Sequence, residues 1–452
     1  MSPLDELRDR LPAGAVRDDP DVTRTLARDS TDLLTAGLPA AAVRAHSVAE
    51  VQEVLRWASR HRVGVLPRGG GTGISGGAIA PDGCLVLDLS AMTRILELSA
   101  EDRLAVVEPG VINAALSAAA APHGLMYAPD PSSWETSTIG GNIATNAGGL
   151  RCIRYGATRA SVLGLTVVLA DGRLLRTGGR TLKRSAGYDL TQLLVGSEGT
   201  LGIVVEATVR LHPLPPPQLT ALITFPGVMA AAATAAALVD TGPPPLLLEL
   251  MDALHVRAID ELRGTGFGSA VGAVLVLQLD DAPDSAATLH RIADAGGASD
   301  VALTTDAAEA RDLLDIRRAA YPAMQRVGRT LVEDVCVPRS RLADMVAAVE
   351  QTGADTGVLV GSVAHAGDGN VHPILVLPEE PDGNDRLWAA ADQIFRTALQ
   401  LGGTVSGEHG IGRLKRRWLA DEVGTTSLDV QRAIKSALDP TGILNPGAIF
   451  EP

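Results

Sequence analysis

Cysteine, lysine and aromatic residues are all scarce in this chain of 452 residues. Its three cysteines, Cys84, Cys152 and Cys336, lie far apart in the sequence, which excludes a disulfide framework, a Cys-rich zinc site and iron–sulfur spacing and suits a reducing compartment. Aromatic residues make up 3%, which argues against a base-stacking surface for nucleic acid. Basic residues (39) are outnumbered by acidic ones (53), and the resulting charge of −14 argues against nucleic-acid or anionic-membrane binding.

Long apolar runs are also lacking. The most apolar window, residues 227–239, is rich in alanine and ends at Asp240. It is shorter than the roughly 18 residues that a membrane-spanning helix needs, and its composition favours a packed helix of a globular protein. The first residues are charged and lack the apolar centre of a secretory signal. We therefore expect a cytoplasmic protein.

The length predicts two or three domains, and 46% hydrophobic with 20% charged residues is typical of a folded chain. Residues 1–38 are expected to be a solvated helical segment. Residues 39–217 form a domain of short β segments with Gly-rich turns, and the prolines at its end mark a boundary. Residues 218–452 form a second domain, in which strands and helices first alternate as in a ferredoxin-like sheet. The expected fold class is α+β.

Hydrophobic periodicity gives the individual elements. Helices are predicted at residues 48–60, 227–239, 285–295, 341–350, 386–401 and 427–437. Strands are predicted at residues 63–67, 84–89, 104–108, 163–170, 174–177, 203–211, 220–225, 246–250, 273–279, 301–304, 358–365 and 371–377.

A glycine-rich loop follows the predicted strand at residues 63–67. Its Gly71, Gly73 and Gly76 match the spacing of a dinucleotide-binding fingerprint. That fingerprint needs a helix that opens at the loop and holds the pyrophosphate, but here the next strand begins at Cys84 and leaves no room for one. A Gly-Lys-Ser/Thr ending is absent too, which excludes a P-loop. Consecutive glycine amides can still bind an anion without a helix.

Two further stretches of this kind occur at residues 138–149 and 195–202. Each loop alone could be a structural turn. Three of them in one β-rich domain predict a single extended ligand that carries phosphate and runs between the loops.

Three of the nine histidines, His365, His372 and His409, fall within positions 365–409. His365 and His372 flank a Gly-Asp-Gly turn between two apolar runs, so a hairpin would bring the two imidazoles together. Two neutral imidazoles make half of a divalent-metal site, although turn-flanking histidines without a metal are common. Glu408 and His409 lie in a Gly-rich loop, and Glu408 could complete a His₂-carboxylate set with open positions for substrate. These ligand types do not distinguish Zn²⁺, Mn²⁺ and Fe²⁺.

Four motifs in this order resemble one family: PRGGGTGISGG (67–77), APDPSS (128–133), TIGGNIATNAGG (138–149) and GYDLTQLLVGSEGTLGIVVEATVRLHP (187–213). They are similar to the FAD-linked oxidases of the vanillyl-alcohol oxidase/p-cresol methylhydroxylase fold, in the branch of the D-lactate, glycolate and D-2-hydroxyglutarate dehydrogenases. The resemblance extends from about residue 39 to residue 450. It implies a two-part, mixed α/β FAD-binding domain at 39–217, followed by a cap domain at 218–452 with an antiparallel ferredoxin-like sheet.

The resemblance also implies which residues hold FAD. The pyrophosphate would lie against Arg68, Gly69, Gly70, Gly71, Thr72, Gly73, Ser75 and Gly76. Contacts to the adenosine and the flavin ring would come from Pro131, Ser132, Thr138, Gly141, Asn142, Ala147, Glu198, Gly202, Ile203 and Asn445. Members with covalent flavin often carry His where this chain has Thr72, so we expect non-covalent FAD. The family's usual Lys after Asn-Pro-Gly is Ala448 here, which puts a further cationic contact in doubt.

In the resembling family, HAGDGNxH and SGEHGIG are the metal and catalytic motifs. Carried over, the metal ligands would be His365, His372 and Glu408, the general base would be His409, and Asn370 would contact substrate. The family's Arg at the position of Arg317 clamps the substrate carboxylate, as a planar guanidinium does well. Lys415, one of only three lysines, is a further candidate catalytic residue.

The expected function is FAD-dependent oxidation of a D-2-hydroxy acid, such as lactate or 2-hydroxyglutarate, to the 2-oxo acid. The metal would assist by polarising the hydroxyl, and the hydride would pass to flavin N5. Alternatives are a glycolate- or polyol-type flavin oxidase that uses oxygen, and a flavin-binding subunit of a larger dehydrogenase complex. The expected partners are the substrate and an external electron acceptor, which could be an electron-transfer flavoprotein, a quinone or a cytochrome; a homodimer is also compatible with the sequence.

Overall fold

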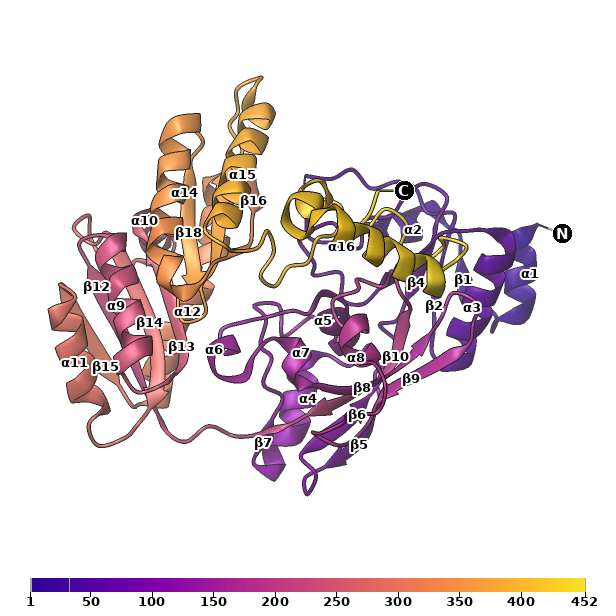
Figure 1. Ribbon diagram of the computed structural model, residues 1–452, viewed down its shortest axis with the longest axis horizontal. Coiled ribbons are helices and arrows are strands. Elements are labelled where there is room, and N and C mark those ends of the chain that lie inside the picture. The colour runs from indigo at the N-terminus through magenta and orange to yellow at the C-terminus, as the bar shows by residue number, and fades with distance from the viewer. Residues whose placement is uncertain (1, 32, 452) are drawn as a thin grey trace. The chain divides into compact units, whose positions relative to one another are not determined.

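The computed structural model describes residues 2–31 and 33–451, which fold into two compact units (Figure 1). The first unit contains the described residues of Met1–Gly148, Gly156–Leu214 and Glu408–Pro452, and the second contains Gly149–Tyr155 and Pro215–Gly407. Most of the second unit is therefore one long insertion into the first. No helix within the described residues is both long and apolar enough to cross a membrane.

This division differs from the one expected from the sequence. The N-terminal residues are not a separate solvated segment, because they belong to the first unit and bury Leu7 completely. The chain leaves the first unit after Leu214, within the expected proline-rich break. It returns at Glu408, so the last 45 residues do not belong to the same unit as residues 215–407. The reason is that the first unit's core is incomplete without the C-terminal segment.

The first sheet of the first unit has the strand order β1-β2-β4-β3, in which β2, β4 and β3 run parallel. Helix α3 begins after Ser47, whose hydroxyl accepts a hydrogen bond from the amide of Glu50, and it ends at Arg62 in a left-handed conformation. The elements here are α1 (Pro3–Arg10), β1 (Val16–Arg17), α2 (Pro20–Leu26), β2 (Ala41–Arg44), α3 (Val48–His61), β3 (Val65–Arg68) and β4 (Leu85–Asp88).

The second sheet of this unit is antiparallel, with the order β5-β6-β10-β8-β9, and β7 pairs separately with β11. Its elements are β5 (Ile95–Ser99), β6 (Leu104–Val107), α4 (Asn113–Ala120), η1 (Ala121–His123), β7 (Leu125–Met126), α5 (Ile139–Thr145), α7 (Thr158–Ser161), β8 (Val162–Val168), β9 (Leu174–Gly178), α8 (Leu190–Leu194), β10 (Ile203–Arg210) and β11 (His212–Pro213). Helix α16 (Arg416–Leu438), kinked at Gly424, precedes the C-terminal segment.

One hydrophobic core connects the two sheets of the first unit. It contains Leu87 of the parallel sheet and Ile203 of the antiparallel sheet. Ile443 and Leu444 of the C-terminal segment complete it, and Leu444 forms a parallel bridge with Val65. Residues almost 400 positions apart in the chain thus form one core.

The second unit is built on one sheet with the order β15-β12-β14-β13-β18-β19-β16, and β17 also pairs with β19. The first four strands along the chain are arranged fourth-first-third-second and all pair antiparallel, which confirms the expected ferredoxin-like arrangement. The elements are α6 (Cys152–Tyr155), β12 (Gln218–Phe225), α9 (Val228–Thr241), β13 (Pro245–Asp252), α10 (Ala253–Arg263), β14 (Ala273–Asp280), α11 (Ser285–Ala295), β15 (Asp300–Thr304), α12 (Ala307–Arg318), α13 (Ala320–Val327), β16 (Thr330–Val332), β17 (Val335–Cys336), η2 (Arg339–Arg341), α14 (Leu342–Thr356), β18 (Val360–His365), β19 (Asn370–Val376) and α15 (Gly383–Gln400).

Helices cover both faces of this sheet (Figure 1). Helices α9, α11 and α14 contact one another or the strands on one face, and α15 packs on α14. Helices α10, α12 and α13 lie on the other face. The Ala-rich run became α9, which buries Ala231, Ala232 and Ala235, as its composition predicts for a packed helix.

Several helices were missing from the sequence prediction. Helix α5 lies inside the second glycine-rich stretch, where two adjacent glycines disfavour a helix. The Thr138 hydroxyl caps it by accepting a hydrogen bond from the Gly141 amide, and Ile139 and Ile143 are fully buried. Tertiary packing therefore decides this helix against local propensity. Helices α10, α12 and α13 were also not predicted.

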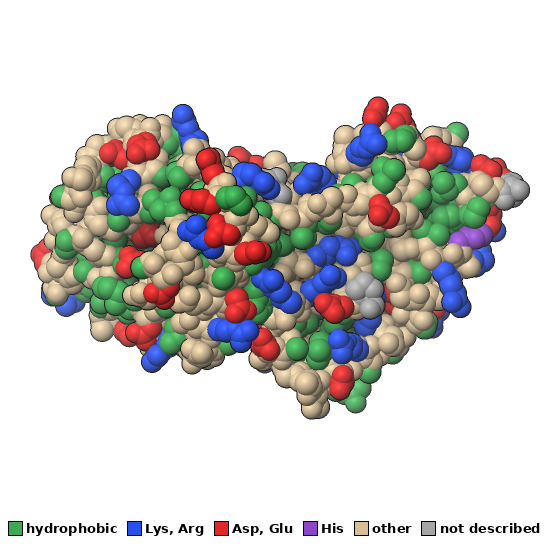
Figure 2. Space-filling model, turned by 90° about the horizontal axis from the view of Figure 1, so that it is seen from above, with side chains coloured by type: hydrophobic (Ala, Val, Ile, Leu, Met, Phe, Trp, Pro, Cys, Tyr) green, Lys and Arg blue, Asp and Glu red, His purple; other side chains and the backbone are tan. Residues whose placement is uncertain are grey.

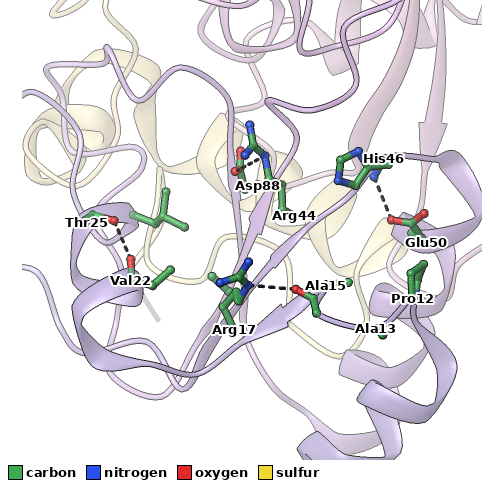
Figure 3. A pocket seen from close by; sticks show the side chains of 13 residues that line it. Pro12, Ala13, Ala15, Arg17, Val22, Thr25, Arg44, His46, Glu50 and Asp88 are labelled. Atoms are coloured by element: carbon green, nitrogen blue, oxygen red, sulfur yellow. Dashed lines mark hydrogen bonds and ion pairs between the residues drawn. The ribbon is translucent and has the colours of Figure 1, made fainter.

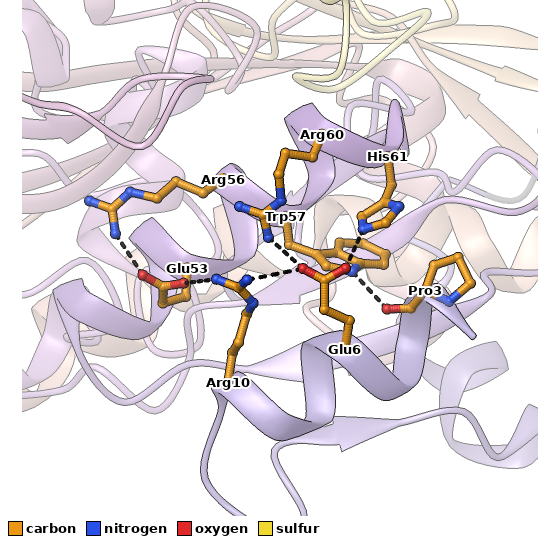
Figure 4. A network of polar contacts seen from close by, with 8 residues as sticks. All are labelled: Pro3, Glu6, Arg10, Glu53, Arg56, Trp57, Arg60 and His61. Carbon is orange, nitrogen blue, oxygen red and sulfur yellow. Dashed lines mark hydrogen bonds and ion pairs between the residues drawn. The ribbon is translucent and has the colours of Figure 1, made fainter. Parts of the chain in front are cut away.

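The N-terminal helix α1 is attached to α3 by an apolar contact and a surface ion network (Figure 4). The indole Nε1 of Trp57 donates to the carbonyl of Pro3 at 2.7 Å, and the Trp57 side chain is 1% exposed. Around it, the carboxylate of Glu6 contacts Arg10, Arg60 and His61 at 2.8–3.1 Å. Exposed ion pairs contribute little each, so the buried indole should hold α1 in place.

We therefore expect Trp57→Ala to lower the free energy of unfolding by about 3–5 kcal/mol, because it leaves a cavity between α1 and α3. Trp57→Phe should cost less, since it keeps most of the ring and removes the hydrogen bond to Pro3. Urea unfolding followed by circular dichroism measures both. Arg10→Ala is the control for the ion network, and a loss from Arg10→Ala as large as that from Trp57→Ala would contradict this assignment.

Candidate functional site

The first two glycine-rich loops pack against each other at backbone distance. A Cβ on Gly69 would collide with the Thr138 hydroxyl. A Cβ on Gly70 would lie 2.6 Å from the carbonyl oxygen of Thr136. Both positions therefore require glycine, because any side chain would push the two loops apart.

The third loop joins the same place. The amides of Gly196 and Glu198 donate to the carbonyls of Ile143 and Ala144, at 2.9 and 2.8 Å, at the end of α5. Gly199 adopts a φ of +70°, and a Cβ there would collide with the ring of Pro67 at the entrance to the first loop. The three loops that the sequence predicted to share one ligand are thus neighbours in the first unit.

The loops present polar groups that the chain itself does not satisfy. Within the described residues, the amides of Gly70, Gly71 and Gly73 donate no hydrogen bond. The side-chain nitrogen of Asn142 and the side-chain oxygen of Asn445 are buried and likewise have no partner in the described part of the chain. A buried unpaired polar group costs about 1–3 kcal/mol, so these atoms point to a bound ligand. Adjacent glycine amides suit phosphate oxygens, and the cradle therefore fits the pyrophosphate of FAD.

All of the predicted cofactor residues lie in the first unit. Asn445 is held in the cradle because its Nδ2 donates to the carbonyls of Gly77 and Glu198 at 2.9 and 2.8 Å. The Ala147 amide and the Thr138 hydroxyl, in contrast, serve helix α5 and its end. Ala147 and Thr138 would therefore contribute to ligand binding through the shape of the loop.

The side chain of Glu198 contacts the backbone of a loop that is distant in the sequence. Its carboxylate accepts hydrogen bonds from the amides of Ile411 and Gly412, at 2.7 and 2.9 Å, and so anchors the loop that follows His409. Burial raises the pKa of Glu198 to about 7, although these amide bonds and the charge of Lys415 act to lower it. The carboxylate thus holds this loop in place, and a contact between Glu198 and the cofactor stays a prediction.

Glu408 and His409 open the segment that returns to the first unit. A Cβ on Gly148, at the end of the second loop, would collide with the Glu408 carboxylate. The Nε2 atom of His409 lies 3.7 Å from Oε1 of Glu408. Lys415, five residues beyond Gly410, is 1% exposed. These candidate catalytic residues therefore belong to the same unit as the glycine-rich loops.

His365 and His372 lie in the second unit on the paired strands β18 and β19. Their ring centroids are 5.0 Å apart with the planes nearly perpendicular, and their ligand nitrogens come within 4.8 Å of each other. Both side chains are less than 10% exposed. Two converging imidazoles on a rigid hairpin could hold a divalent ion, as the sequence predicted for this pair.

A buried carboxylate lies behind each histidine, and the sequence reasoning missed both. Oε1 of Glu249 is 2.8 Å from Nδ1 of His365, and Oδ1 of Asp334 is 3.8 Å from Nδ1 of His372. The hydroxyl of Ser406 donates to the other oxygen of Asp334 at 2.9 Å. A carboxylate beside one ring nitrogen of a histidine can orient the ring so that its other nitrogen binds a metal. A single acid inside an apolar run, such as Glu249 within residues 245–251, was the available signal.

Arg317 and Asn370 lie in the second unit with the two histidines. Arg317 is in the last turn of α12, and its Nε donates to Oε2 of Glu249 at 2.8 Å, whereas the adjacent Arg318 pairs with Asp315 at the surface. Asn370 is opposite His365 in the hairpin, and its Oδ1 is buried without a partner in the described residues. Burial would raise the pKa of Glu249, but the charge of Arg317 and the hydrogen bonds from His365 and Arg317 hold it below its ordinary value.

A cavity of about 500 Å³ elsewhere in the first unit does not compete with this assignment (Figure 3). None of the residues that line it is a predicted site residue. Its charged groups already have partners: Arg44 lies 3.6 Å from Asp88, and Arg17 donates to the carbonyl of Gly14. Figure 2 shows acidic and basic side chains interspersed on one face of the molecule, so the net charge of −14 does not form a single acidic patch there.

Comparisons with known proteins match both units. A family model described as "FAD linked oxidases, C-terminal domain" matches residues 214–449, and one described as "FAD binding domain" matches residues 39–178. The chain is 40% identical over 419 residues to the glycolate oxidase subunit GlcD of Bacillus subtilis, covering 91% of this chain and 89% of the relative. It is 37% identical over 400 residues to the D-lactate dehydrogenase of Archaeoglobus fulgidus, covering 88% and 89%.

Solved structures support the fold. The structure of p-cresol methylhydroxylase superposes with a TM-score of 0.81 at 18% identity, covering 98% of this chain and 95% of that one. A 4-ethylphenol oxidase from Gulosibacter chungangensis superposes with a TM-score of 0.78 at 19% identity, covering 98% and 96%. At these identities the likeness shows the fold alone. It confirms the fold expected from the four sequence motifs.

The position of Glu198 yields a prediction about pH. Its folded-state pKa of about 7 lies above the ordinary 4.5, so the native state holds this proton more tightly than the unfolded state does. Its contribution to stability is therefore fully present below about pH 4.5 and is lost as the pH rises through about 7. Thermal unfolding of wild type and Glu198→Gln between pH 5 and pH 8 should show wild type losing stability relative to the variant. Parallel curves would contradict the raised pKa.

Proposed function

The chain belongs to the FAD-linked oxidases, and from this membership we propose that it oxidises a D-2-hydroxy acid to the 2-oxo acid with non-covalent FAD. The observation that carries the proposal is the polar cluster on the second unit's sheet, where His365 and Arg317 share the buried carboxylate of Glu249 and the ring of His372 lies beside that of His365. A guanidinium suits the substrate carboxylate, and a metal held by imidazoles suits the adjacent hydroxyl. The names of the relatives, a glycolate oxidase subunit and a D-lactate dehydrogenase, agree with this class of substrate.

The first unit would hold the flavin. The amides of Gly70, Gly71 and Gly73 would bind the pyrophosphate, and Asn142 and Asn445 would direct their unpaired atoms to the cofactor. Thr72 offers no imidazole for a covalent link. FAD, when bound, supplies the acceptor for the hydride that leaves C2 of the substrate.

We further propose a divalent metal, with Zn²⁺ first and Mn²⁺ or Fe²⁺ as alternatives, held by His365, His372 and Glu408. Within the second unit, a Cβ on Gly407 would lie 2.5 Å from Oδ1 of Asn370, the residue opposite His365. Glu408 is the next residue along the chain, so it is only one peptide from that strand end. A metal ion, when bound, supplies Lewis-acid polarisation of the substrate hydroxyl.

The remaining residues act on the substrate directly. Arg317 would bind the carboxylate and fix which face of C2 is presented. Asn370 would use its buried, unpaired Oδ1 to accept a hydrogen bond from substrate. His409 would accept the hydroxyl proton, since an imidazole changes charge near neutral pH. Lys415, buried beyond this loop, would supply a fixed positive charge.

A second candidate function is a flavin-binding subunit of a larger complex, which the subunit names of the GlcD relatives favour. The alternative of a glycolate- or polyol-type oxidase that uses oxygen would not need the imidazole pair. Whether the chain is a dehydrogenase by itself or a subunit of a larger dehydrogenase, the electrons would leave the flavin through an electron-transfer flavoprotein, a quinone or a cytochrome. We place this reaction in the cytoplasm, where the thiols of Cys84, Cys152 and Cys336 would stay reduced.

The function is tested by screening D- and L-2-hydroxy acids against an artificial dye acceptor. We expect the yellow protein to reduce dye with one or more D-acids, and acid denaturation to release intact FAD. Prior chelation of metal should abolish dye reduction, and added Zn²⁺ or Mn²⁺ should restore it, because the ion polarises the hydroxyl. A colourless protein that cannot be loaded with FAD, or full activity without metal, would contradict the corresponding part of the proposal.

His409→Ala and His365→Ala should fail in different ways. His365→Ala should lose metal and activity while the flavin spectrum stays intact, because the cradle is in the other unit. His409→Ala should keep flavin and metal but reduce flavin ~10²–10⁴ times more slowly, since it removes a proton acceptor. Stopped-flow reduction and metal analysis measure the two effects. Loss of metal from His409→Ala would make His409 a ligand, and a wild-type rate would remove its role as base.

A further inference from the structure

Glu249 is a buried acid on a face of the sheet that is otherwise apolar. On β13 its side chain shares a face with Met251, and across the strands it is paired with Val276 and His365. Met251 and Val276 belong to the hydrophobic core beneath α10 and α13. Glu249 is 0% exposed. A carboxylate in such a place is costly unless it is paired, and a reason beyond packing should exist for keeping it there.

The carboxylate of Glu249 is shared by two residues. Nδ1 of His365 lies 2.8 Å from Oε1 and 2.9 Å from Oε2, and Oε2 also accepts the Nε–H of Arg317 at 2.8 Å. Arg317 comes from α12 and His365 from β18, so Glu249 on β13 is the common partner of side chains from two other elements. All three residues lie in the second unit.

This contact fixes the proton on His365. An ionised carboxylate can only accept hydrogen bonds, so Nδ1 of His365 must be the protonated nitrogen. The neutral imidazole then carries its lone pair on Nε2, which is the form that a metal requires. Without the carboxylate, either tautomer would be available and the ring would be free to turn.

The same contact fixes the direction of Arg317. Glu249 engages the Nε–H, and the edge formed by the two Nη groups is not used by Glu249. That edge carries parallel N–H groups which suit a carboxylate. Arginine loses less freedom on binding when another residue already holds its guanidinium.

We propose that Glu249 is a positioning residue that orients His365 as a metal ligand and Arg317 as the clamp of the substrate carboxylate. This inference rests on the proposed function, because it assigns Glu249 a role through two residues of the proposed site. Glu249 does not touch substrate or metal. One buried carboxylate couples the two groups that meet the hydroxyl and the carboxylate of the substrate.

Glutamine cannot replace Glu249 in this arrangement. Its amide is neutral and has only one acceptor oxygen, so its NH₂ group replaces the second carboxylate oxygen and brings a donor against the N–H of His365 or Arg317. Aspartate keeps the charge but is shorter by one methylene. Glu249→Gln should therefore disturb both partners, and Glu249→Asp should rescue part of the loss.

The experiment uses FAD-loaded enzyme from which metal has been removed by chelation. Zn²⁺ is titrated by calorimetry into wild type, Glu249→Gln, Glu249→Asp and the control Glu261→Gln, which changes an exposed acid of α10. For Glu249→Gln we expect the Kd for Zn²⁺ to rise 10–100-fold. KM for the 2-hydroxy acid should rise about tenfold or more, while kcat at saturating Zn²⁺ and substrate changes far less. The control should match wild type.

A merely structural Glu249 would lower the melting temperature and leave the Kd for Zn²⁺ and KM unchanged, and that result overturns the proposal. If Glu249→Gln does not fold, Glu249→Asp decides by the same titration. A wild type that binds no Zn²⁺ removes the metal from the proposed function and this role of Glu249 with it. A wild type that binds Zn²⁺ but oxidises no 2-hydroxy acid defeats the proposed function alone, and the Zn²⁺ titration still decides whether Glu249 orients His365.

Discussion

The first unit depends on the return of the C-terminal segment to the edge of its parallel sheet. The amide of Val65 donates to the carbonyl of Ile443, and the amide of Asn445 donates to the carbonyl of Val65. Since Val65 leads directly into the first glycine-rich loop, these bonds fix the loop's starting point. More than 190 residues of the second unit follow Leu214 before the chain returns to the first unit. The strand at Val65 is therefore completed only after the second unit has been traversed. The loop with Glu408 and His409 lies at the point of return.

The two units solve different physical problems. The cradle of the first unit needs close approach of backbones, and glycine is the only residue that allows Gly69 and Gly70 to touch the loop at Thr136–Thr138. The sheet of the second unit holds buried carboxylates, and Glu249 and Asp252 are tolerated because His365, Arg317 and His255 form hydrogen bonds with them. Replacing one partner would leave an uncompensated charge in the core. Backbone atoms thus prepare one unit for a phosphate-bearing cofactor, and paired side chains prepare the other for a polar substrate.

The sequence by itself determined much of this protein. Period-two and period-3.6 patterns predicted the strands around the first loop, the helix at residues 48–60 and the ferredoxin-like order of the second sheet, because each pattern reports one buried face. The motif around His365 and His372 predicted a hairpin, and the structure has both residues on paired strands with ring centroids 5.0 Å apart. The three glycine-rich loops were predicted to converge, and they do. The histidine motif and the glycine-rich loops consist of consecutive residues, so a single sequence is enough to identify them.

Only the tertiary structure decided the rest. Helix α5 forms although its glycines disfavour a helix, because Ile139 and Ile143 are buried. Their burial depends on residues that are distant in the chain. The carboxylate of Glu198 accepts hydrogen bonds from the amides of Ile411 and Gly412, more than 200 positions away. Glu249 becomes the partner of Arg317 and His365 only through the pairing of β13 with β18 and the placement of α12. Long-range strand pairing and burial choose these partners, and no local pattern encodes them.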